Sequence, residues 1–437
     1  MKKVYIAISA DVLHQGHINV INKGNELGDV IIGLLTDEAI ATYKRMPLIP
    51  FEERKIILSN IKGVTEVLEQ KTLDYTENLL KVKPDYVVHG DDWREGVQSK
   101  IREKVIETLK EWGGELVEVP YTTGVSATNL EKQMRELTNT PDNRRAKLRK
   151  LLNLKKTVSV MEASNGLSGL IVENAKYEDL ENSTVKEFDA MWVSSLCDSS
   201  FKGKPDIELV DLTSRLRTIE EIMEVTTKPI ILDGDTGGKL EHFSYNVKTL
   251  ERLGVSAIII EDKTGLKQNS LFGTAAKQVL EEPHEFARKI QAGKKAQVTR
   301  DFLIFARVEA LIAGYGVDEA IERAKIYIEE GGADGIMIHS KEKDGSEIKE
   351  FLRRFRELFA SIPVIVVPTS YNQFTEEELG EWGANIIIHA NHLLRSAYPA
   401  MKKCAESVLK HHRSKEASEE YCISIKEVLN LIPGTKQ

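Results

Sequence analysis

The sequence predicts an α/β protein of two domains, a smaller parallel α/β domain followed by a (β/α)₈ barrel. The chain has 437 residues, which is long enough for two hydrophobic cores. Short runs of β-branched residues alternate with helical patterns in two separate series. A polar turn cluster, Thr138–Asn143, lies between the series and is typical of a linker. We therefore expect domains over residues 1–137 and 144–437, joined by residues 138–143.

The first series, before the linker, alternates strand-like runs with amphipathic helical patterns. The predicted strands are Val4–Ser9, Val30–Thr36, Tyr86–His89 and Leu116–Pro120. The predicted helices are Ile18–Leu27, Glu52–Asn60 and Ser99–Trp112. This alternation is the signature of a parallel, Rossmann-like sheet covered by helices.

The second series follows a basic amphipathic stretch, Arg144–Leu154, and contains eight strand-like runs. The predicted strands are Val158–Glu162, Ala190–Ser194, Ile230–Asp233, Ala257–Glu261, Leu303–Val308, Gly335–His339, Val364–Val367 and Asn385–His389. Eight units over roughly 290 residues match the size of a (β/α)₈ barrel. An open doubly wound sheet is the alternative, but the regular spacing of the eight units favours the barrel.

The composition argues against several classes of partner. Because the formal charge is −8, we expect no basic surface of the kind that attracts nucleic acid or an anionic membrane. The longest apolar runs, such as Val364–Val367, are far below the ~20 residues that span a bilayer. Cys197, Cys404 and Cys422 have no C-x-x-C spacing, which favours a reducing cytoplasm over a disulfide framework or a zinc site.

Charged residues stand at the ends of the predicted barrel strands, where enzymes of this fold place their chemistry. Asp233 and Asp235 follow the third strand with one glycine between them, so both side chains leave it on the same face. Glu261, Arg307 and His339 end the next three strands. Converging carboxylates indicate a hard cation such as Mg²⁺, and an arginine fork suits a phosphate or carboxylate. Taken singly, each residue is also compatible with a helix cap or an ion pair.

The run Ile260–Ser270, I-E-D-K-T-G-L-K-Q-N-S, resembles the E-D-K-x-x-x-K-x-N-S signature of the phosphoenolpyruvate mutases, members of the isocitrate lyase superfamily. The resemblance extends from about Arg144 to the end of the chain. It also includes Glu162–Leu167, Trp192–Leu196 and Ala306–Ala310. The lyases carry a catalytic cysteine after the fourth strand, but no cysteine occurs between Asp262 and Thr274. The resemblance therefore implies a barrel that moves the phosphoryl group of phosphoenolpyruvate from oxygen to carbon C3, giving phosphonopyruvate.

The same resemblance implies a role for each strand-end residue. Asp233 would bind Mg²⁺ directly, while Asp235 and Glu261 would hold it through water molecules. Arg307 and His339 would bind the transferring phosphoryl group. Further implied substrate contacts are Trp192, Ser194 and Leu196 in the pocket, Lys267, Asn269 and Ser270 on a mobile gating loop, and Asp206 near the leaving oxygen. Asp206 is either a covalent nucleophile or a group that steers the phosphoryl group. If water intercepted that group, the reaction would be that of the phosphonopyruvate hydrolases, the main alternative.

In the first domain, His14 and His17 flank Gly16 where the first strand meets the following helix. The N-terminus of that helix, with its dipole and free amide hydrogens, is suited to an anion. A zinc pair or a surface turn is the alternative, although nothing nearby supplies further zinc ligands.

This H-x-G-H motif resembles that of the cytidylyltransferases that activate glycerol phosphate, choline phosphate and ethanolamine phosphate. By that resemblance, His14 and His17 would stabilise the triphosphate of CTP in the transition state. The other implied CTP contacts are Lys44 or Arg45, Ser126 and Thr128 on the phosphates, and Arg54 and Asp91 on the cytidine. The sequence departs from the family where Tyr121 replaces an arginine and Ala127 replaces a hydroxyl residue.

Together the resemblances imply a bifunctional enzyme of phosphonate biosynthesis, as in the fosfomycin pathway, with Mg²⁺ as cofactor. Its substrates would be phosphoenolpyruvate, CTP and a phosphonate, either 2-hydroxyethylphosphonate or 2-aminoethylphosphonate. A mutase with a non-catalytic, nucleotide-sensing domain is a further alternative. Because the mutase family assembles as tetramers, we also expect a homo-oligomer, tetramer or dimer, formed through the barrel.

Overall fold

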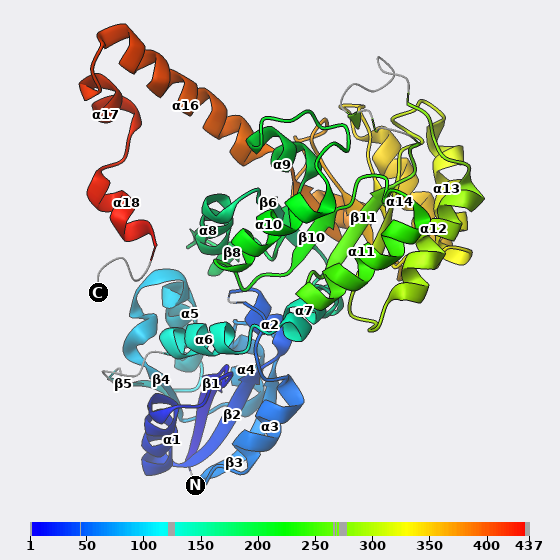
Figure 1. The fold of residues 1–437 in the computed structure, drawn as a ribbon. Helices are drawn as coiled ribbons and strands as arrows, with labels where there is room; N and C mark the ends of the chain where they lie inside the picture. Colours follow the sequence, from blue (N-terminus) through cyan, green and yellow to red (C-terminus); the bar gives the residue numbers. More distant parts are fainter. Residues whose placement is uncertain are drawn as a thin grey trace.

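Two parallel sheets organise the molecule, one in each domain (Figure 1). The computed structural model describes residues 2–43, 45–120, 127–264, 267, 269–270 and 278–432, with residues 127–129 described by their backbone alone. The first sheet is open and has five strands, whereas the second closes into an eight-stranded barrel. Both fold classes expected from the sequence are confirmed.

The first sheet has the order β3-β2-β1-β4-β5, with all neighbouring strands parallel. Its strands are β1 (Lys3–Ile8), β2 (Asp29–Leu35), β3 (Val64–Gln70), β4 (Tyr86–Gly90) and β5 (Glu115–Val119). The central strand β1 is buried along almost its whole length, as its run of Val, Tyr, Ile and Ala requires. Strand β3 was not predicted. It is an edge strand that carries Glu66 and Glu69 among its apolar residues, so its sequence has the polar pattern of a loop.

Helices cover both faces of this sheet. They are α1 (Gln15–Leu27), α2 (Asp37–Ala41), α3 (Phe51–Ser59), α4 (Thr76–Val82), α5 (Ser99–Lys110) and α6 (Ala127–Leu137), with two short 3₁₀ turns, η1 (Asp91–Arg94) and η2 (Gly96–Gln98). His14 caps α1, because its ring nitrogen accepts a hydrogen bond from the amide of Gly16. The cap fixes the ring of His14 at the carboxyl edge of the sheet.

All eight predicted barrel strands are present and pair in sequence order. They are β6 (Val158–Glu162), β9 (Ala190–Val193), β10 (Ile230–Asp233), β11 (Ala257–Glu261), β12 (Leu303–Val308), β13 (Gly335–Ile338), β14 (Val364–Val366) and β15 (Ile386–His389). Alternate side chains such as Ile231, Phe305 and Ile365 fill the interior of the barrel. A small antiparallel hairpin, β7 (Lys176–Asp179) with β8 (Thr184–Glu187), was not predicted.

The helices of the second domain surround these strands, except that the last three project from the barrel. They are α7 (Pro141–Leu154), α8 (Gly166–Asn174), α9 (Ser195–Phe201), α10 (Leu212–Met223), α11 (Leu240–Leu253), α12 (Pro283–Ala296), α13 (Gly316–Glu329), α14 (Ser346–Leu358), α15 (Glu376–Trp382), α16 (His392–His411), α17 (Lys415–Tyr421) and α18 (Ile425–Leu431). Helix α7 begins at Pro141, within the residues 138–143 expected to form the linker, and Thr140 caps it.

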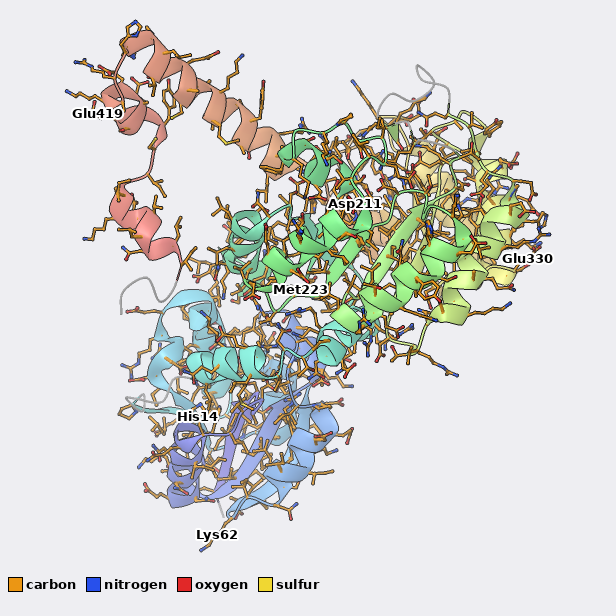
Figure 2. All side chains as sticks on the ribbon, in the orientation of Figure 1. His14, Lys62, Asp211, Met223, Glu330 and Glu419 are labelled. Atoms are coloured by element: carbon orange, nitrogen blue, oxygen red, sulfur yellow. The ribbon has the colours of Figure 1, made fainter. Side chains whose placement is uncertain are left out.

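Helices α16, α17 and α18 form an arm that projects from the barrel (Figures 1 and 2). Several large apolar side chains of the arm are exposed, including Tyr398, Leu409 and Ile425, which is 75% exposed. In the part of the chain that the structure describes, no helix is both long and apolar enough to cross a membrane.

The N-terminal domain packs against the end of the barrel at which the strands begin. Arg45 donates to Glu173 at the end of α8 (2.7 Å), to Glu187 of β8 (3.0 Å) and to the hydroxyl of Thr227 just before β10 (3.1 Å). Asn139 donates to the carbonyl of Thr226 (3.2 Å). The carboxyl ends of the barrel strands therefore open on the side away from the N-terminal domain.

Candidate active sites in the barrel and the N-terminal domain

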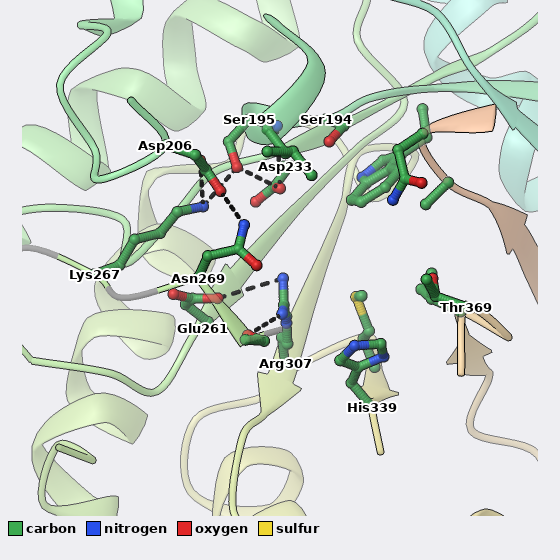
Figure 3. Close-up of a pocket in the computed structure, with 17 residues that line it drawn as sticks. Ser194, Ser195, Asp206, Asp233, Glu261, Lys267, Asn269, Arg307, His339 and Thr369 are labelled. Atoms are coloured by element: carbon green, nitrogen blue, oxygen red, sulfur yellow. Dashed lines mark hydrogen bonds and ion pairs between the residues drawn. The ribbon is translucent and has the colours of Figure 1, made fainter. Parts of the chain in front are cut away.

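A pocket of about 510 Å³ occupies the mouth of the barrel, at the carboxyl ends of the strands (Figure 3). The predicted site residues that line it are Trp192, Ser194, Leu196, Asp206, Asp233, Glu261, Lys267, Asn269, Ser270, Arg307 and His339. Asp235, the remaining predicted residue of this site, does not line the pocket but contacts Lys267, which does. The strand-end residues thus converge, because closure of the barrel brings their ends to one rim.

Asp233 and Asp235 are both buried at the end of β10. Gly234 is required between them, since a Cβ there would lie 2.9 Å from the carbonyl oxygen of Ile259. Ser195 donates its backbone amide (3.2 Å) and its hydroxyl (2.9 Å) to Asp233. Burial opposes ionisation, but Lys267, Arg307 and Arg215 hold the pKa of Asp233 well below its usual value. Asp233 is therefore an anion aimed into the pocket.

Lys267 links three parts of the rim. Its ammonium lies 2.5 Å from Asp235, 3.2 Å from Asp206 and 2.5 Å from the hydroxyl of Ser195. Although burial disfavours the charged amine, Asp233 and Asp235 raise its pKa above the usual value. Lys267 therefore stays cationic and neutralises carboxylates that would otherwise repel one another.

Asn269 and Ser270 lie over the pocket from the segment that follows β11. Asn269 donates to Asp206 (2.7 Å). The hydroxyl of Ser270 receives hydrogen bonds from Lys263 (2.7 Å) and Arg307 (2.7 Å) and donates to Glu309 (2.6 Å). All of these contacts are buried or half-buried, so the two residues close this part of the mouth to water.

Arg307, Glu261 and His339 form the other side of the pocket. Arg307 pairs with Glu309 and lies 3.3 Å from Glu261. Burial raises the pKa of Glu261 to about 7, in spite of the nearby cations. Burial and the neighbouring Arg307 lower the pKa of His339 to about 4, so the imidazole is neutral at physiological pH. A neutral ring can donate one hydrogen bond to an anion without adding charge.

The donor set at this rim fits a magnesium ion held mainly through water. Asp233, Asp235 and Glu261 offer carboxylate oxygens, which hard cations prefer. Within the described residues, no group of three or more His, Cys, Asp or Glu side chains is arranged to enclose a metal ion directly. Oε1 of Glu261 is buried and accepts no hydrogen bond from the residues that the structure describes. One direct ligand with two water-mediated ones is consistent with this arrangement.

Sequence reasoning missed three side chains that hold the site. Ser195 bonds to both Asp233 and Lys267, and it stands beside the predicted Ser194. Arg215 of α10 lies 3.0 Å from Asp235 and also donates to the carbonyl of Asp233. Lys263 lies 2.9 Å from Glu309 and is part of the E-D-K motif itself. No strand-end position marks Arg215, because it reaches the rim from a helix.

A second cavity, of about 1080 Å³ with its open mouth, lies at the carboxyl edge of the N-terminal sheet. His14 and His17 line it, with ring centroids 4.0 Å apart (His14 is labelled in Figure 2). Nδ1 of His14 accepts from Gly16, and Nδ1 of His17 accepts from the amide of His14 (3.3 Å). A neutral ring with Nδ1 as the acceptor carries its hydrogen on Nε2. His89, stacked on Trp93 at 3.8 Å, lines the same cavity.

The other predicted CTP contacts are not all brought to this cavity. Arg45 lies at the domain junction, among barrel residues. Arg54 is fully buried, and its guanidinium donates to the carbonyls of Ser9, Leu35 and Ile49 and to Asp37, so it braces the fold instead of facing the cavity. Asp91 begins η1, next to Asp92, which lines the cavity. Lys44, Tyr121, Ser126 and the side chains of Ala127 and Thr128 lie outside the described residues.

Comparison with known proteins assigns both halves of the chain. The family model of phosphoenolpyruvate phosphomutase matches residues 148–409, and the cytidylyltransferase-like model matches residues 9–165. Phosphoenolpyruvate phosphomutase of Tetrahymena pyriformis is 36% identical over 285 residues, 65% of this chain and 89% of that protein. Phosphonopyruvate hydrolase of Variovorax sp. (strain Pal2) is 34% identical over 286 residues, 65% of this chain and 93% of that protein.

Solved structures of the same two enzymes resemble the barrel. Phosphoenolpyruvate phosphomutase from Streptomyces platensis subsp. rosaceus superposes with a TM-score of 0.59 at 34% identity, covering 66% of this chain and 94% of that chain. A phosphonopyruvate hydrolase complex with oxalate and Mg²⁺ gives a TM-score of 0.57 at 32% identity, covering 67% and 94%. The chain therefore belongs to the phosphoenolpyruvate phosphomutase family and carries a cytidylyltransferase-like domain at its N-terminal end.

Proposed function

We propose that the barrel converts phosphoenolpyruvate to phosphonopyruvate and that the N-terminal domain transfers CMP from CTP to a phosphonate. The observation that carries the first half is the contact of Lys267 and Asn269 with Asp206 over the pocket. These contacts border the part of the pocket in which a phosphoryl group would leave the enol oxygen and bond to C3. In the rearrangement the bond from phosphorus to the enol oxygen breaks, a bond from phosphorus to C3 forms, and no atom is gained or lost.

The residues of the barrel mouth suit this reaction. Arg307 has a planar fork for phosphoryl oxygens, and neutral His339 adds a donor. Phosphoryl transfer proceeds through a loose transition state, so catalysis consists of positioning and charge stabilisation. Ser194 and Leu196 line the pocket, and the hydroxyl of the first and the amide of the second would bind the substrate carboxylate. Asp206, which accepts a hydrogen bond from Asn269 and lies 3.2 Å from Lys267, would steer the transferring group without bonding to it.

Magnesium is the proposed cofactor of the barrel. Asp233 would hold it directly and Asp235 and Glu261 through water, at the rim where these carboxylates lie. When bound, the ion neutralises charge on the substrate and on the transferring group. The Mg²⁺ in the complex of the related phosphonopyruvate hydrolase supports this assignment.

Hydrolysis of phosphonopyruvate is the second candidate for the barrel, because the identity to a phosphonopyruvate hydrolase is nearly as high as that to a mutase. A hydrolase needs a group that positions a water molecule on phosphorus. Among the described residues, Oδ2 of Asp206 accepts a hydrogen bond from Asn269, whereas Oδ1 lies 3.2 Å from the ammonium of Lys267 and accepts no hydrogen bond. The contact with Asn269 supports rearrangement over hydrolysis.

For the N-terminal domain, the two Nε2 donors of His14 and His17 support cytidylyl transfer. An oxygen of the phosphonate would attack the α-phosphorus of CTP, and the bond to pyrophosphate would break. Charge then develops on the bridging oxygen and the pyrophosphate, where hydrogen-bond donors lower the barrier. The cavity volume suits a nucleotide, and the flat pair His89 and Trp93 offers a surface for a base.

One ³¹P NMR experiment tests both halves. The full chain is incubated with Mg²⁺ and phosphoenolpyruvate, and separately with Mg²⁺, CTP and either 2-hydroxyethylphosphonate or 2-aminoethylphosphonate. We expect a carbon-bound phosphorus signal from the first mixture and pyrophosphate with a CMP–phosphonate signal from one of the others. Because the rearrangement favours the phosphate ester, the carbon-bound signal of the first mixture is weak. The barrel reaction is therefore also followed from phosphonopyruvate, which a mutase converts to phosphoenolpyruvate. Pyruvate and free phosphate from that substrate would favour the hydrolase, and absence of pyrophosphate with both acceptors would reject the transferase assignment.

A further inference from the structure

A third cavity lies between the two domains, at the end of the barrel opposite its mouth. It has a volume of about 610 Å³ and is bordered by α2, α6, α7, β8 and the segments that precede β6, β9 and β10. Its charged lining residues are Arg45, Arg135, Lys147, Lys155, Lys228, Glu187 and Asp189. Five cations thus face two carboxylates, in a chain whose formal charge is −8.

Both carboxylates of this cavity are already neutralised. Glu187 pairs with Arg45 (3.0 Å), Lys176 (3.1 Å) and Lys228 (3.5 Å). Asp189 pairs with Lys155 (2.6 Å). A third carboxylate, Glu173, lies just outside the lining and pairs with Arg45 (2.7 Å).

Among the described residues, the positive charge that these three carboxylates do not pair with is that of Arg135 and Lys147. Arg135 of α6 donates to the carbonyl of Met46 (2.8 Å), and its nearest paired carboxylate, Asp11, is 3.9 Å away and engaged by two backbone amides. Lys147 of α7 donates to the carbonyl of Thr227 (2.6 Å) and to Asn139 (3.2 Å), and no ion pair within the described residues includes it. Burial, together with the nearby Arg135 and Arg144, lowers the pKa of Lys147 to about 8, and Glu173 only partly offsets this effect.

We propose that this cavity is a binding site for a small oxyanion, the doubly charged phosphoryl or phosphonyl group of a short organic acid, held between Arg135 and Lys147. An anion here relieves the repulsion among the lining cations and adds charge-assisted hydrogen bonds in a half-buried setting. Arg135 offers a fork and Lys147 a point charge, a combination that suits tetrahedral oxygens. The volume of about 610 Å³ includes the open mouth of the cavity, where a short carbon chain attached to such a group can extend.

Such a ligand would connect the two domains. Arg135 stands on α6 of the N-terminal domain, whereas Lys147 and Lys228 belong to the barrel side of the junction. The site lies apart from both candidate active sites, because it shares no lining residue with either of their cavities. Occupancy therefore strengthens the junction without blocking catalysis, and it does so whether or not the proposed reactions are correct.

The first test locates the anion. Crystals of the full chain are soaked in sodium tungstate, whose anomalous scattering marks an oxyanion. We expect a peak in the cavity within hydrogen-bonding distance of Arg135 and Lys147. A data set that has peaks at the barrel mouth or beside His14 and His17 but no peak in the cavity overturns the proposal. This test uses the unmodified chain, so it does not depend on the folding of a variant.

The second test measures binding in solution. Calorimetric titration with inorganic phosphate, phosphoglycolate and phosphonoacetate is compared between the wild type and the double variant Arg135→Gln/Lys147→Gln. The control is Lys132→Gln/Lys150→Gln, which removes two exposed cations from the same helices. We expect the cavity variant to lose one binding event, or to weaken it roughly tenfold or more, while the control retains it. Equal titrations of the two double variants overturn the proposal, and the preferred ligand distinguishes ester phosphate from phosphonate.

Discussion

Asn269 donates a 2.7 Å hydrogen bond to Asp206, and this contact joins the segment after β11 to the segment after α9. Lys267 makes the parallel ion pair with the other oxygen of Asp206 at 3.2 Å. Oδ2 of Asp206 is thus held by a hydrogen bond, while Oδ1 has only the ion pair and accepts no hydrogen bond within the described residues. The orientation of Asp206 therefore depends on two side chains of the segment after β11.

Replacing Asn269 with alanine should shift the outcome of the barrel reaction. The variant frees one oxygen of Asp206 and opens the mouth, so we expect kcat for phosphonopyruvate formation to fall about 10- to 100-fold. Part of the product should become pyruvate and phosphate, which ³¹P NMR separates from phosphonopyruvate. Asn182→Ala, in an exposed turn, is the control. An unchanged product ratio with lowered kcat would mean that Asn269 positions the substrate without excluding water.

Asp233→Ala should abolish the barrel activity and leave CMP transfer intact. The variant removes the anion that Ser195 orients toward the pocket, and with it the proposed direct ligand of magnesium. The measurements are the rate of the barrel reaction over a range of Mg²⁺ concentrations and pyrophosphate release from CTP. Loss of both activities would contradict the assignment and indicate a folding defect or coupling between the domains.

His17→Ala should impair CMP transfer and leave the barrel activity intact. The variant removes one of two Nε2 donors at the start of α1, and we expect kcat of CMP transfer to fall roughly 100- to 1000-fold. Barrel activity should stay at the wild-type level. His284→Ala serves as the control, because that histidine is exposed on α12. Pyrophosphate release at the wild-type rate would exclude His17 from the reaction.

Arg45→Met should weaken the junction between the domains without raising the KM for CTP. Arg45 neutralises Glu173 and Glu187, and its loss leaves two half-buried carboxylates without that partner, at a cost of about 2 kcal/mol. Urea unfolding followed by fluorescence should report a lowered midpoint for the first transition. Arg252→Met, on the exposed side of α11, is the matched control. A raised KM for CTP with an unchanged midpoint would return Arg45 to the phosphate site predicted from the sequence.

Stability should rise with pH in the alkaline range. Burial lowers the pKa of Lys228, like that of Lys147, to about 8, below the usual value of 10.5. Between these two values the unfolded chain binds more protons than the folded chain, so the free energy of unfolding increases as pH rises from 8 to 10.5. Below pH 8 the cost of burying the charged amines is fully present.

This dependence is measured as urea midpoints at half-unit intervals from pH 7.5 to 10, about the span that the two pKa values define. Lys228→Met removes one of the titrating groups, so its midpoints should rise less steeply than those of the wild type. Lys150→Met, with an exposed side chain, should retain the full slope. Identical slopes for the wild type and Lys228→Met would contradict the low pKa of Lys228.

The barrel and the residues at its mouth were predictable from two things: the regular spacing of the strand-like runs and the closure of eight strands into a barrel. Eight β-branched runs defined the strands, and a closed barrel has one rim, so Asp233, Glu261, Arg307 and His339 had to meet. Strand β3 was missed because an edge strand exposes its polar residues and lacks the continuous apolar run that marked β1.

Long cationic side chains were the least predictable part. Arg45 and Arg54 were assigned to CTP from their place in a motif, yet Arg45 reaches across to the barrel and Arg54 turns inward to four acceptors. The position of a guanidinium group depends on which hydrogen-bond acceptors lie within its reach, and only the tertiary fold brings those acceptors close. Arg215 illustrates the converse, since it reaches Asp235 from a helix that carries no motif.

The orientation of the barrel also determines how the two halves of one chain cooperate. Because the N-terminal domain is attached where the strands begin, a product that leaves the mouth emerges on the far side of the molecule. Within a single chain, such a product enters the surrounding solution first. Only then could it, or a compound made from it, reach the cavity that contains His14 and His17. Under the proposed function, fusion of the domains supplies the two sites in equal numbers, and within one chain the described residues place the two cavities on opposite sides of the junction between the domains.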